Sequence, residues 1–241
     1  GMNAALQIQG REPVVLDRSQ AYIGVLIDDL ITKDNREPYR MMTSRAEYRL
    51  LLRQDNADLR LREIGYRAGL VSEEEYRYTC QKMEWIRNEV SRLKAAMVGA
   101  SAPIQQFLLK HESSPLKTAA SLAELLCRPE LNYELLAEID PEREKLPADV
   151  IEQVEIELKY EGYIGRQRKQ VDQFKKMEEK KIPGWVDYDE VPSLRLEARQ
   201  KLKEFQPVSV GQASRISGVS PADISVLLVF LEHHGRQQQV D

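Results

Sequence analysis

Apolar residues recur every three or four positions over most of this chain, the spacing that gathers them on one side of an α-helix. The clearest run follows Ser72-Glu-Glu-Glu75, where the serine and the third glutamate can cap a helix start, and predicts a helix to about Met97. This periodicity predicts an all-α fold with many helices. The other expected helices cover about residues 17–30, 56–68, 118–127, 132–139, 148–181, 194–205, 210–217 and 221–233.

Glycine and proline mark the ends of several helices and one expected close contact. Gly218 lies where a left-handed turn would end a helix, just before the capping sequence Ser220-Pro-Ala-Asp223. Gly24 falls inside a helix, where it costs roughly 1 kcal/mol relative to Ala, so backbone is expected to approach it closely. Residues 32–38 are expected to turn, and residues 99–115 to form a connection with one helical turn.

An arginine-rich segment stands out against this background. Residues 36–62 contain seven arginines, no lysine and four acids, which gives +3 in a chain of net charge −4. Arginine suits phosphate because its planar fork donates two parallel hydrogen bonds and is weakly hydrated. The absence of lysine favours a polyanion-binding surface over an ordinary solvated face.

The spacing of three of these arginines predicts a cationic row. Arg45, Arg49 and Arg53 are four residues apart, which places them on one face of a helix or of a strand. A helix from Ala46 onward is the preferred interpretation, and a short strand pair near residues 37–53 stays open.

The last two expected helices form a pair similar to a helix-turn-helix, opened by the capping sequence Ser209-Val-Gly-Gln212. Helix 221–233 has no basic residue before His233, so it does not suit the reading of DNA bases. Its apolar residues exceed what one buried face needs. Ile224, Leu227 and Leu231 are assigned to the core, while the residues expected to dock a partner protein are Val226, Val229, Phe230, Gln212 and Arg215. For Gln212 and Arg215, contact with RNA or a role only in local capping stays open.

Composition narrows the remaining possibilities. The 241 residues are 42% apolar and 31% charged, with no apolar run long enough to cross a membrane, which predicts a cytoplasmic location. Cys80, Cys127 and three scattered histidines make no zinc-type group, and no glycine-rich phosphate loop follows a strand. Gly1 before Met2 is interpreted as a cloning remnant, so a cut fragment that is not catalytic alone is expected.

Several long stretches resemble one protein family. They are Glu37-Pro-Tyr-Arg-Met-Met-Thr-Ser-Arg-Ala-Glu-Tyr-Arg-Leu-Leu-Leu-Arg53, residues 19–30, Lys159-Tyr-Glu-Gly-Tyr-Ile164 and residues 211–224. In this order they are similar to the C-terminal part of the MnmG family, also called GidA. Residues 3–6 resemble the end of the helix that closes the family's dinucleotide domain.

The resemblance implies a tRNA wobble-uridine carboxymethylaminomethyl modification enzyme, whose FAD domain and reactive cysteines precede this region. It also implies NADH, methylene-folate and glycine or ammonium as co-substrates, a homodimer, and the GTPase MnmE as partner. No cofactor is expected on the fragment itself. The expected parts are residues 1–70 with the arginine segment, a helical domain at 71–206 and a small helical subdomain at 207–241.

The resemblance and the basic residues together suggest tRNA contacts. Arg60 and Arg62 are expected to brace the flavin domain instead. The basic side of helix 148–181, where Tyr160 and Tyr163 are interleaved, fits a tRNA-facing role and a solvated surface equally well. The residues expected to contact tRNA are Arg40, Arg45, Arg49, Arg53, Lys159, Arg166, Arg168 and Lys169.

Two alternatives of other classes stay open. A helical protein-interaction scaffold would use its arginines only at protein interfaces. A DNA-binding regulator is disfavoured by the apolar final helix.

Overall fold

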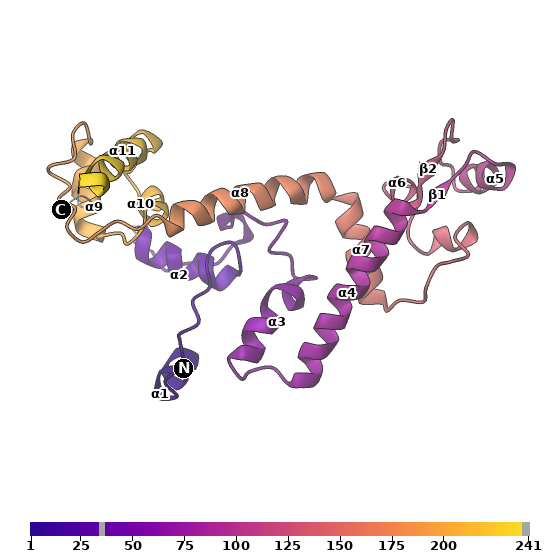
Figure 1. The fold of residues 1–241 in the computed structure, drawn as a ribbon, viewed down its shortest axis with the longest axis horizontal. Coiled ribbons are helices and arrows are strands. Elements are labelled where there is room, and N and C mark those ends of the chain that lie inside the picture. Colours follow the sequence, from indigo (N-terminus) through magenta and orange to yellow (C-terminus); the bar gives the residue numbers. More distant parts are fainter. Residues whose placement is uncertain (34–36, 238–241) are drawn as a thin grey trace. The chain divides into compact units, whose positions relative to one another are not determined.

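The computed structural model describes residues 1–33 and 37–237, except for the side chains of 235–237. The described chain is mostly helical and carries a two-stranded antiparallel sheet, which confirms the expected all-α class (Figure 1). It divides into two compact units: unit 1 comprises Gly1–Val14 and Leu50–Arg166, and unit 2 comprises Val15–Arg49 and Gln167–Asp241. Among the described residues, no helix is both long and apolar enough to pass through a membrane.

Unit 1 contains both strands of the sheet together with several helices. They are α1 (Met2–Ile8), α3 (Ala57–Arg67), α4 (Glu73–Ala95), β1 (Met97–Val98), α5 (Ala102–Lys110), β2 (Ala120–Ser121), α6 (Leu122–Leu126), the 3-10 helix η2 (Leu135–Glu138) and α7 (Ala148–Lys159).

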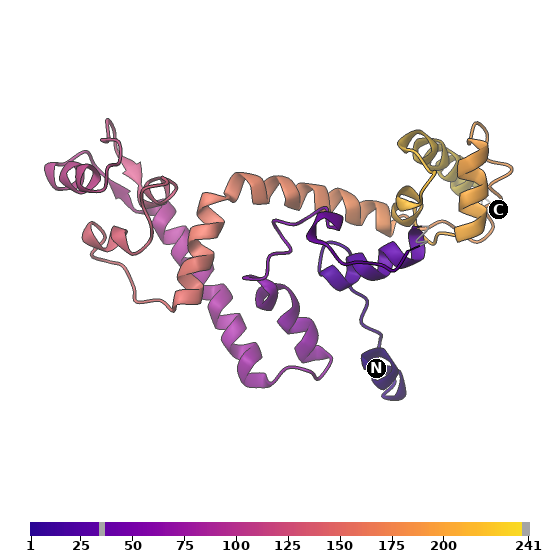
Figure 2. The same ribbon diagram turned by 180° about the vertical axis from the view of Figure 1, so that it is seen from behind.

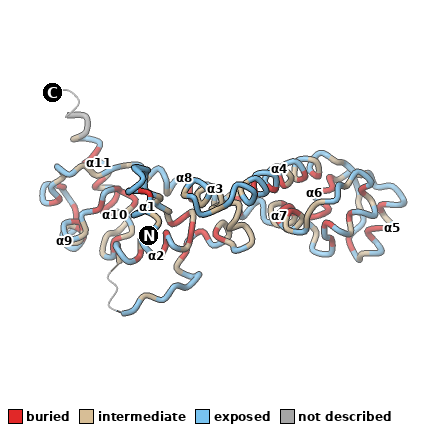
Figure 3. Tube along the Cα trace, turned by 90° about the horizontal axis from the view of Figure 1, so that it is seen from below, coloured by how far each residue is buried: buried red, intermediate tan, exposed pale blue. Residues whose placement is uncertain are grey.

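Helix α4 is the centre of unit 1 and packs against α7, α3 and α6 (Figure 2). Both halves of its expected capping box form: Ser72 Oγ accepts from Glu75 N at 3.3 Å, and Glu75 Oε2 accepts from Ser72 N at 3.0 Å. The buried face of α4 carries Ile86 and Leu93, which meet Val150 and Val154 of α7 in one core. Figure 3 marks such buried positions in red.

The two strands of the sheet lie at residues 97–98 and 120–121, and not near residues 37–53, where the sequence leaves a strand pair open. Met97 pairs with Ser121 and Val98 with Ala120, while described residues 47–51 form turns and Thr43–Arg45 forms the 3-10 helix η1. The expected helix from Ala46 onward is likewise wrong, since α3 starts only at Ala57. Side chains satisfy the turn carbonyls: Arg53 donates to Leu50 O at 2.6 Å and Asn56 to Leu51 O at 3.1 Å.

Unit 2 holds the C-terminal helices and the early segment that packs on them. Its elements are α2 (Tyr22–Thr32), η1, the part of α8 (Glu161–Glu179) from Gln167 onward, α9 (Leu196–Phe205), α10 (Val210–Arg215) and α11 (Pro221–Gln237).

The core of unit 2 joins α9, α10 and α11 with the loop before α9. Leu202, Val210 and Leu227 are fully buried there, and Ile224 and Leu231 are also buried, as expected from the sequence. The capping sequence of α11 forms, with Ser220 and Asp223 exchanging backbone and side-chain hydrogen bonds. For α10 only the serine half forms, because the Gln212 side chain accepts from Val208 N instead.

The close approach expected at Gly24 is present. A Cβ on Gly24 would lie 2.2 Å from Asp17 O, so no larger residue fits without movement. Gly218 has φ +94°, the left-handed conformation expected after α10.

Three other expectations need correction. The expected helix 148–181 is interrupted at Tyr160, which ends α7, and continues as α8 only to Glu179. Residues 102–110 form the full helix α5 rather than a single turn. Helix α2 starts at Tyr22, without a side-chain cap from Asp17 or Ser19. The turn expected over 32–38 falls partly outside the described residues.

Candidate functional site

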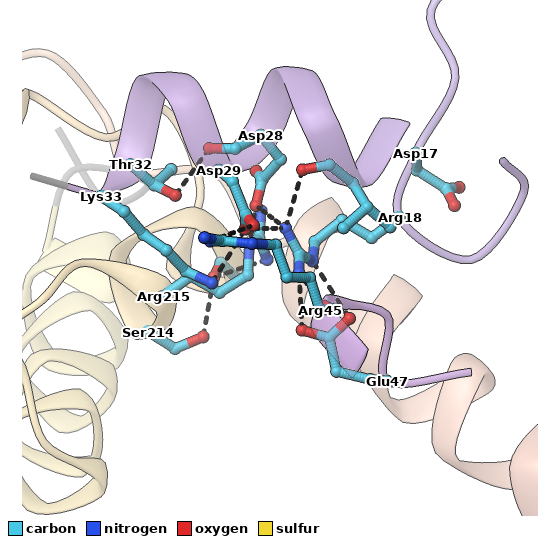
Figure 4. Close-up of polar contacts among 12 residues, drawn as sticks. Asp17, Arg18, Asp28, Asp29, Thr32, Lys33, Arg45, Glu47, Ser214 and Arg215 are labelled. Atoms are coloured by element: carbon cyan, nitrogen blue, oxygen red, sulfur yellow. Dashed lines mark hydrogen bonds and ion pairs between the residues drawn. The ribbon is translucent and has the colours of Figure 1, made fainter. Parts of the chain in front are cut away.

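Arg18 forms the centre of a buried polar cluster in unit 2 (Figure 4). Its side chain is only 2% exposed and donates to Asp29 Oδ1 at 2.6 Å, to Glu47 Oε1 at 2.7 Å and to Asp28 Oδ2 at 3.0 Å. It also donates to the carbonyl oxygens of Val25 and Arg45. Burial alone would lower the pKa of Arg18, but the hydrogen bonds that it donates to Glu47 and Asp29 raise this pKa above its ordinary value. Arg18 therefore stays charged and ties α2 to residues 45–47.

Asp29 is fully buried and is the main acceptor of this cluster. Besides Arg18, it accepts from the Tyr39 hydroxyl at 2.8 Å and pairs with Lys33 at 2.9 Å and Arg45 at 3.7 Å. Burial would raise the pKa of Asp29, but bonds from Lys33, Arg18 and Tyr39 lower it below its usual range. The carboxylate is thus ionised and fully partnered, as a buried charge requires.

Arg215 extends the cluster to α8 and α10. Its guanidinium contacts Asp28 and Glu178, donates to Gly211 O at 2.8 Å, and lies 5.2 Å from the centre of the Phe174 ring. Only 16% of the Arg215 side chain is exposed. This residue, expected at a partner surface, is occupied inside unit 2.

Most arginines of the 36–62 segment also have internal partners. Arg45 stacks on Tyr39, with its guanidinium carbon 4.4 Å from the ring centre. Arg53 contacts Asp55 at 3.1 Å and Gln153. Arg60 and Arg62 donate within unit 1, to Asn56 at 2.8 Å and to Thr79 at 3.2 Å respectively. The expected row of Arg45, Arg49 and Arg53 does not form, because turns replace the regular element that would align them.

Arg40 and Arg49 differ from these four arginines because they have no such internal partner in the described chain. Both are exposed, and neither has an ion pair or a hydrogen bond within the part of the chain that the structure describes. Both belong to unit 2. Among the described residues of this segment, the guanidinium groups of Arg40 and Arg49 are therefore available to a ligand.

The basic residues around the α7–α8 junction have mixed surroundings. Lys159 donates to Leu131 O at 2.9 Å and pairs with Glu155 at 3.5 Å. Arg166 lies over the exposed Tyr163 ring at 4.7 Å. Arg168 and Lys169 are exposed positions of α8 in unit 2.

An apolar hollow of about 490 Å³ lies beside α11 in unit 2. Its lining includes three residues assigned to partner docking: Val229 is 56% exposed, Val226 is half-buried and Phe230 is buried. Phe230 stacks on His234 with ring centres 4.1 Å apart. Phe230 is thus a core residue with one edge at the hollow, and Gln212 does not line it.

Arg18 was absent from the sequence-based candidates, although it is the best-connected side chain described above. Its signal in the sequence is Asp28-Asp29, two acids inside the otherwise apolar stretch Ile27-Asp-Asp-Leu30. Acidic side chains that become buried when a helix packs into a core need a cation beside them. The sequence does not show which arginine supplies it.

Two family profiles match the chain one after the other. Residues 73–168 match the tRNA modifying enzyme MnmG/GidA C-terminal helical domain, and residues 170–241 match the MnmG/GidA C-terminal helical bundle.

Curated relatives agree with the profiles. The tRNA uridine 5-carboxymethylaminomethyl modification enzyme MnmG of Caldicellulosiruptor saccharolyticus is 62% identical over 96% of this chain and 37% of its own length. The enzyme of the same name from Lachnoclostridium phytofermentans is 61% identical over 99% of this chain and 38% of its length. The chain thus spans little more than a third of these relatives.

Solved structures show the same fold. Aquifex aeolicus GidA in its form II crystal superposes with a TM-score of 0.78 at 44% identity, covering 95% of this chain and 36% of the GidA chain. The form I crystal gives a TM-score of 0.75 at 43% identity, with 95% and 35% covered. By sequence and by structure, this chain belongs to the MnmG/GidA family and corresponds to its C-terminal helical region.

Proposed function

We propose that the chain holds tRNA and docks a partner protein as the C-terminal region of an FAD-dependent enzyme that adds a carboxymethylaminomethyl group to wobble uridine. The main support is the 62% identity, over almost the whole chain, to a relative named for modification of tRNA uridine. The whole protein would act in the cytoplasm, where tRNA is used, and the family resemblance suggests that it does so as a homodimer.

Arg40 and Arg49 are the proposed phosphate contacts. Each offers a guanidinium that is exposed and has no partner in the described chain, in contrast to Arg45 and Arg53. A guanidinium already paired with a carboxylate would have to lose that bond before binding phosphate. The two unpaired groups can bind phosphate without this cost, and such contacts supply affinity with little base discrimination.

Further basic residues of α7 and α8 are proposed as additional tRNA contacts, each considered by itself. Arg166 stacks on Tyr163, a residue that is 59% exposed, and aromatic rings beside arginine suit unpaired RNA bases. Arg168 and Lys169 are exposed and are proposed as contacts too. Lys159 is also a proposed contact, and its ammonium donates to Leu131 O.

The proposed docking surface for the GTPase MnmE is the hollow beside α11. Val226 and Val229 supply apolar area there, and Phe230 supplies an edge. Arg215 is not proposed to touch the partner directly, since it is held by Asp28 and Glu178. Gln212 contributes only local capping through Val208 N.

The described residues do not fit a dinucleotide site. They form helices and one two-stranded antiparallel sheet, while FAD domains of the Rossmann type need a parallel sheet with a glycine-rich turn. FAD, NADH and methylene-folate are therefore assigned to parts of the whole enzyme that this chain does not include.

The proposal is tested by deleting the gene of the whole protein in its native host and measuring modified nucleosides in purified tRNA by mass spectrometry. Loss of carboxymethylaminomethyl uridine, restored by the wild-type gene, is expected. Unchanged levels of that nucleoside would contradict the proposed reaction.

A helical scaffold without RNA binding remains the second candidate. It is favoured by one observation, the internal pairing of Arg45, Arg53, Arg60 and Arg62. A whole protein that binds its partner but not tRNA would support the scaffold.

A further inference from the structure

Each of the two unpaired arginines directly follows a tyrosine whose side chain is fixed. Arg40 follows Tyr39, whose hydroxyl donates to Asp29 Oδ2 at 2.8 Å. Arg49 follows Tyr48, which is buried and has its ring centre 6.0 Å from that of Phe174. Because both tyrosines are held inside unit 2, the backbone that carries each arginine is held as well.

Tyr39 is held from two sides. Its hydroxyl reaches the fully buried Asp29, and its ring lies under the guanidinium of Arg45 at 4.4 Å. Asp29 is in turn fixed by Arg18, which is itself nearly buried. The position of Tyr39 is thus linked to the centre of the Arg18 cluster through one hydrogen bond.

An exposed arginine loses side-chain and backbone freedom when it binds a phosphate. The part of that loss that comes from the backbone is smaller when the backbone is already fixed. A single hydroxyl bond next to Arg40 can therefore influence RNA affinity without touching RNA.

We propose that Tyr39 is a positioning residue: its hydrogen bond to Asp29 holds Arg40 in place to bind a tRNA phosphate. The proposal rests on the proposed function, in particular on Arg40 as a phosphate contact. It assigns to Asp29 and Arg18 the same supporting role, one step further from the ligand.

The chain provides a matched pair of variants for the test. Tyr39→Phe removes the hydroxyl bonded to Asp29 and keeps the ring under Arg45. Tyr48→Phe also removes one hydroxyl beside an exposed arginine, but that hydroxyl makes no hydrogen bond in the described part of the chain. Both are made in the whole protein, alone and combined with Arg40→Ala, and tRNA affinity is measured by filter binding together with the melting temperature.

Tyr39→Phe is expected to weaken tRNA binding by roughly 2- to 10-fold, the range that corresponds to one hydrogen bond. Tyr48→Phe should leave affinity within error of wild type. In the Arg40→Ala background, Tyr39→Phe should have no further effect, because the residue it positions is gone. A purely structural role would not produce this dependence.

Equal losses with and without Arg40 would overturn the positioning role, and so would an unchanged affinity for Tyr39→Phe. If Arg40→Ala alone leaves tRNA affinity unchanged, the assignment of Arg40 in the proposed function fails, and the positioning role fails with it. The first two results leave that assignment intact, so the two failures are distinguishable.

Discussion

Arg215 and Asp28 are 187 positions apart in the chain, yet their side chains form two parallel hydrogen bonds. The Nε–Oδ2 distance is 2.7 Å and the Nη2–Oδ1 distance is 2.8 Å. This bidentate pair joins α2 to α10 within unit 2 (Figure 4). Both partners are largely buried, so removing Arg215 takes away one of the two arginines that pair with Asp28 and leaves Arg18 as the other.

Arg215→Met should therefore destabilise unit 2. It removes the cation that Asp28 and Glu178 share, while Asp28 keeps Arg18 and Glu178 keeps the Ser209 hydroxyl, so the expected cost is about 1–3 kcal/mol in the free energy of unfolding. Lys203→Met is the matched control, because it breaks an exposed pair with Asp189 and should cost less than about 1 kcal/mol. Urea unfolding followed by circular dichroism compares the two, and equal costs would contradict the structural role of Arg215.

Gly24→Ala should also destabilise the protein, although alanine is the better helix former. The new methyl group would lie 2.2 Å from Asp17 O, and relieving this overlap is expected to cost about 1–3 kcal/mol or more. Gly165→Ala in α8 has open space around its Cβ and should stabilise by roughly 0.5–1 kcal/mol. Melting temperatures should therefore shift in opposite directions, and a stabilising Gly24→Ala would refute the close contact.

The stability of unit 1 should fall at alkaline pH because of Tyr133. This side chain is fully buried and donates to Glu89 Oε1 at 2.7 Å; burial first, and the hydrogen bond to Glu89 second, raise the pKa of Tyr133 from 10.0 to about 12. The folded state then keeps a proton that the unfolded chain releases, so stability is lost as the pH rises from about 10 to about 12. The loss from this group is on the order of 2–3 kcal/mol.

Tyr133→Phe serves as the control because other groups also titrate at alkaline pH. The variant loses one hydrogen bond, while Glu89 keeps both bonds from Arg92. Its unfolding free energy should fall less steeply than that of wild type over this pH range. Identical slopes would show that Tyr133 does not cause the loss.

Features that depend on capping residues or on a single glycine could be predicted from the sequence. The capping sequences at Ser72 and Ser220 form both of their reciprocal bonds, and Gly24 and Gly218 have the close contact and the left-handed φ expected of them. Each of these features depends on residues near one another in the chain, so a single sequence contains the information.

The candidate site was less predictable because it depends on distant partners. Arg45 and Arg49 look alike in the sequence, yet Arg45 contacts Asp29 and Tyr39 whereas Arg49 is unpaired in the described chain. The regular spacing of Arg45, Arg49 and Arg53 did not predict which arginine is unpaired. The segment forms turns instead of a helix or strand, and side chains such as that of Arg53 donate hydrogen bonds to the carbonyl oxygens of these turns. Tertiary contacts, such as that of Arg45 with Asp29 on α2 and that of Arg53 with Gln153, separate the structural arginines from the available ones.

The central claim is that the guanidinium groups of Arg40 and Arg49 bind tRNA phosphates, and salt-dependent binding by the whole enzyme tests it most directly. The affinity of Arg40→Ala/Arg49→Ala for tRNA is measured at several salt concentrations, with Arg77→Ala, an exposed arginine paired with Glu73 on α4, as the control for loss of charge. The double variant should bind more weakly and show a plot of log affinity against log salt that is shallower by about 1–2, since each lost phosphate contact removes up to about one released counterion. Wild-type affinity and slope in the double variant, or the same change in Arg77→Ala, would contradict the claim.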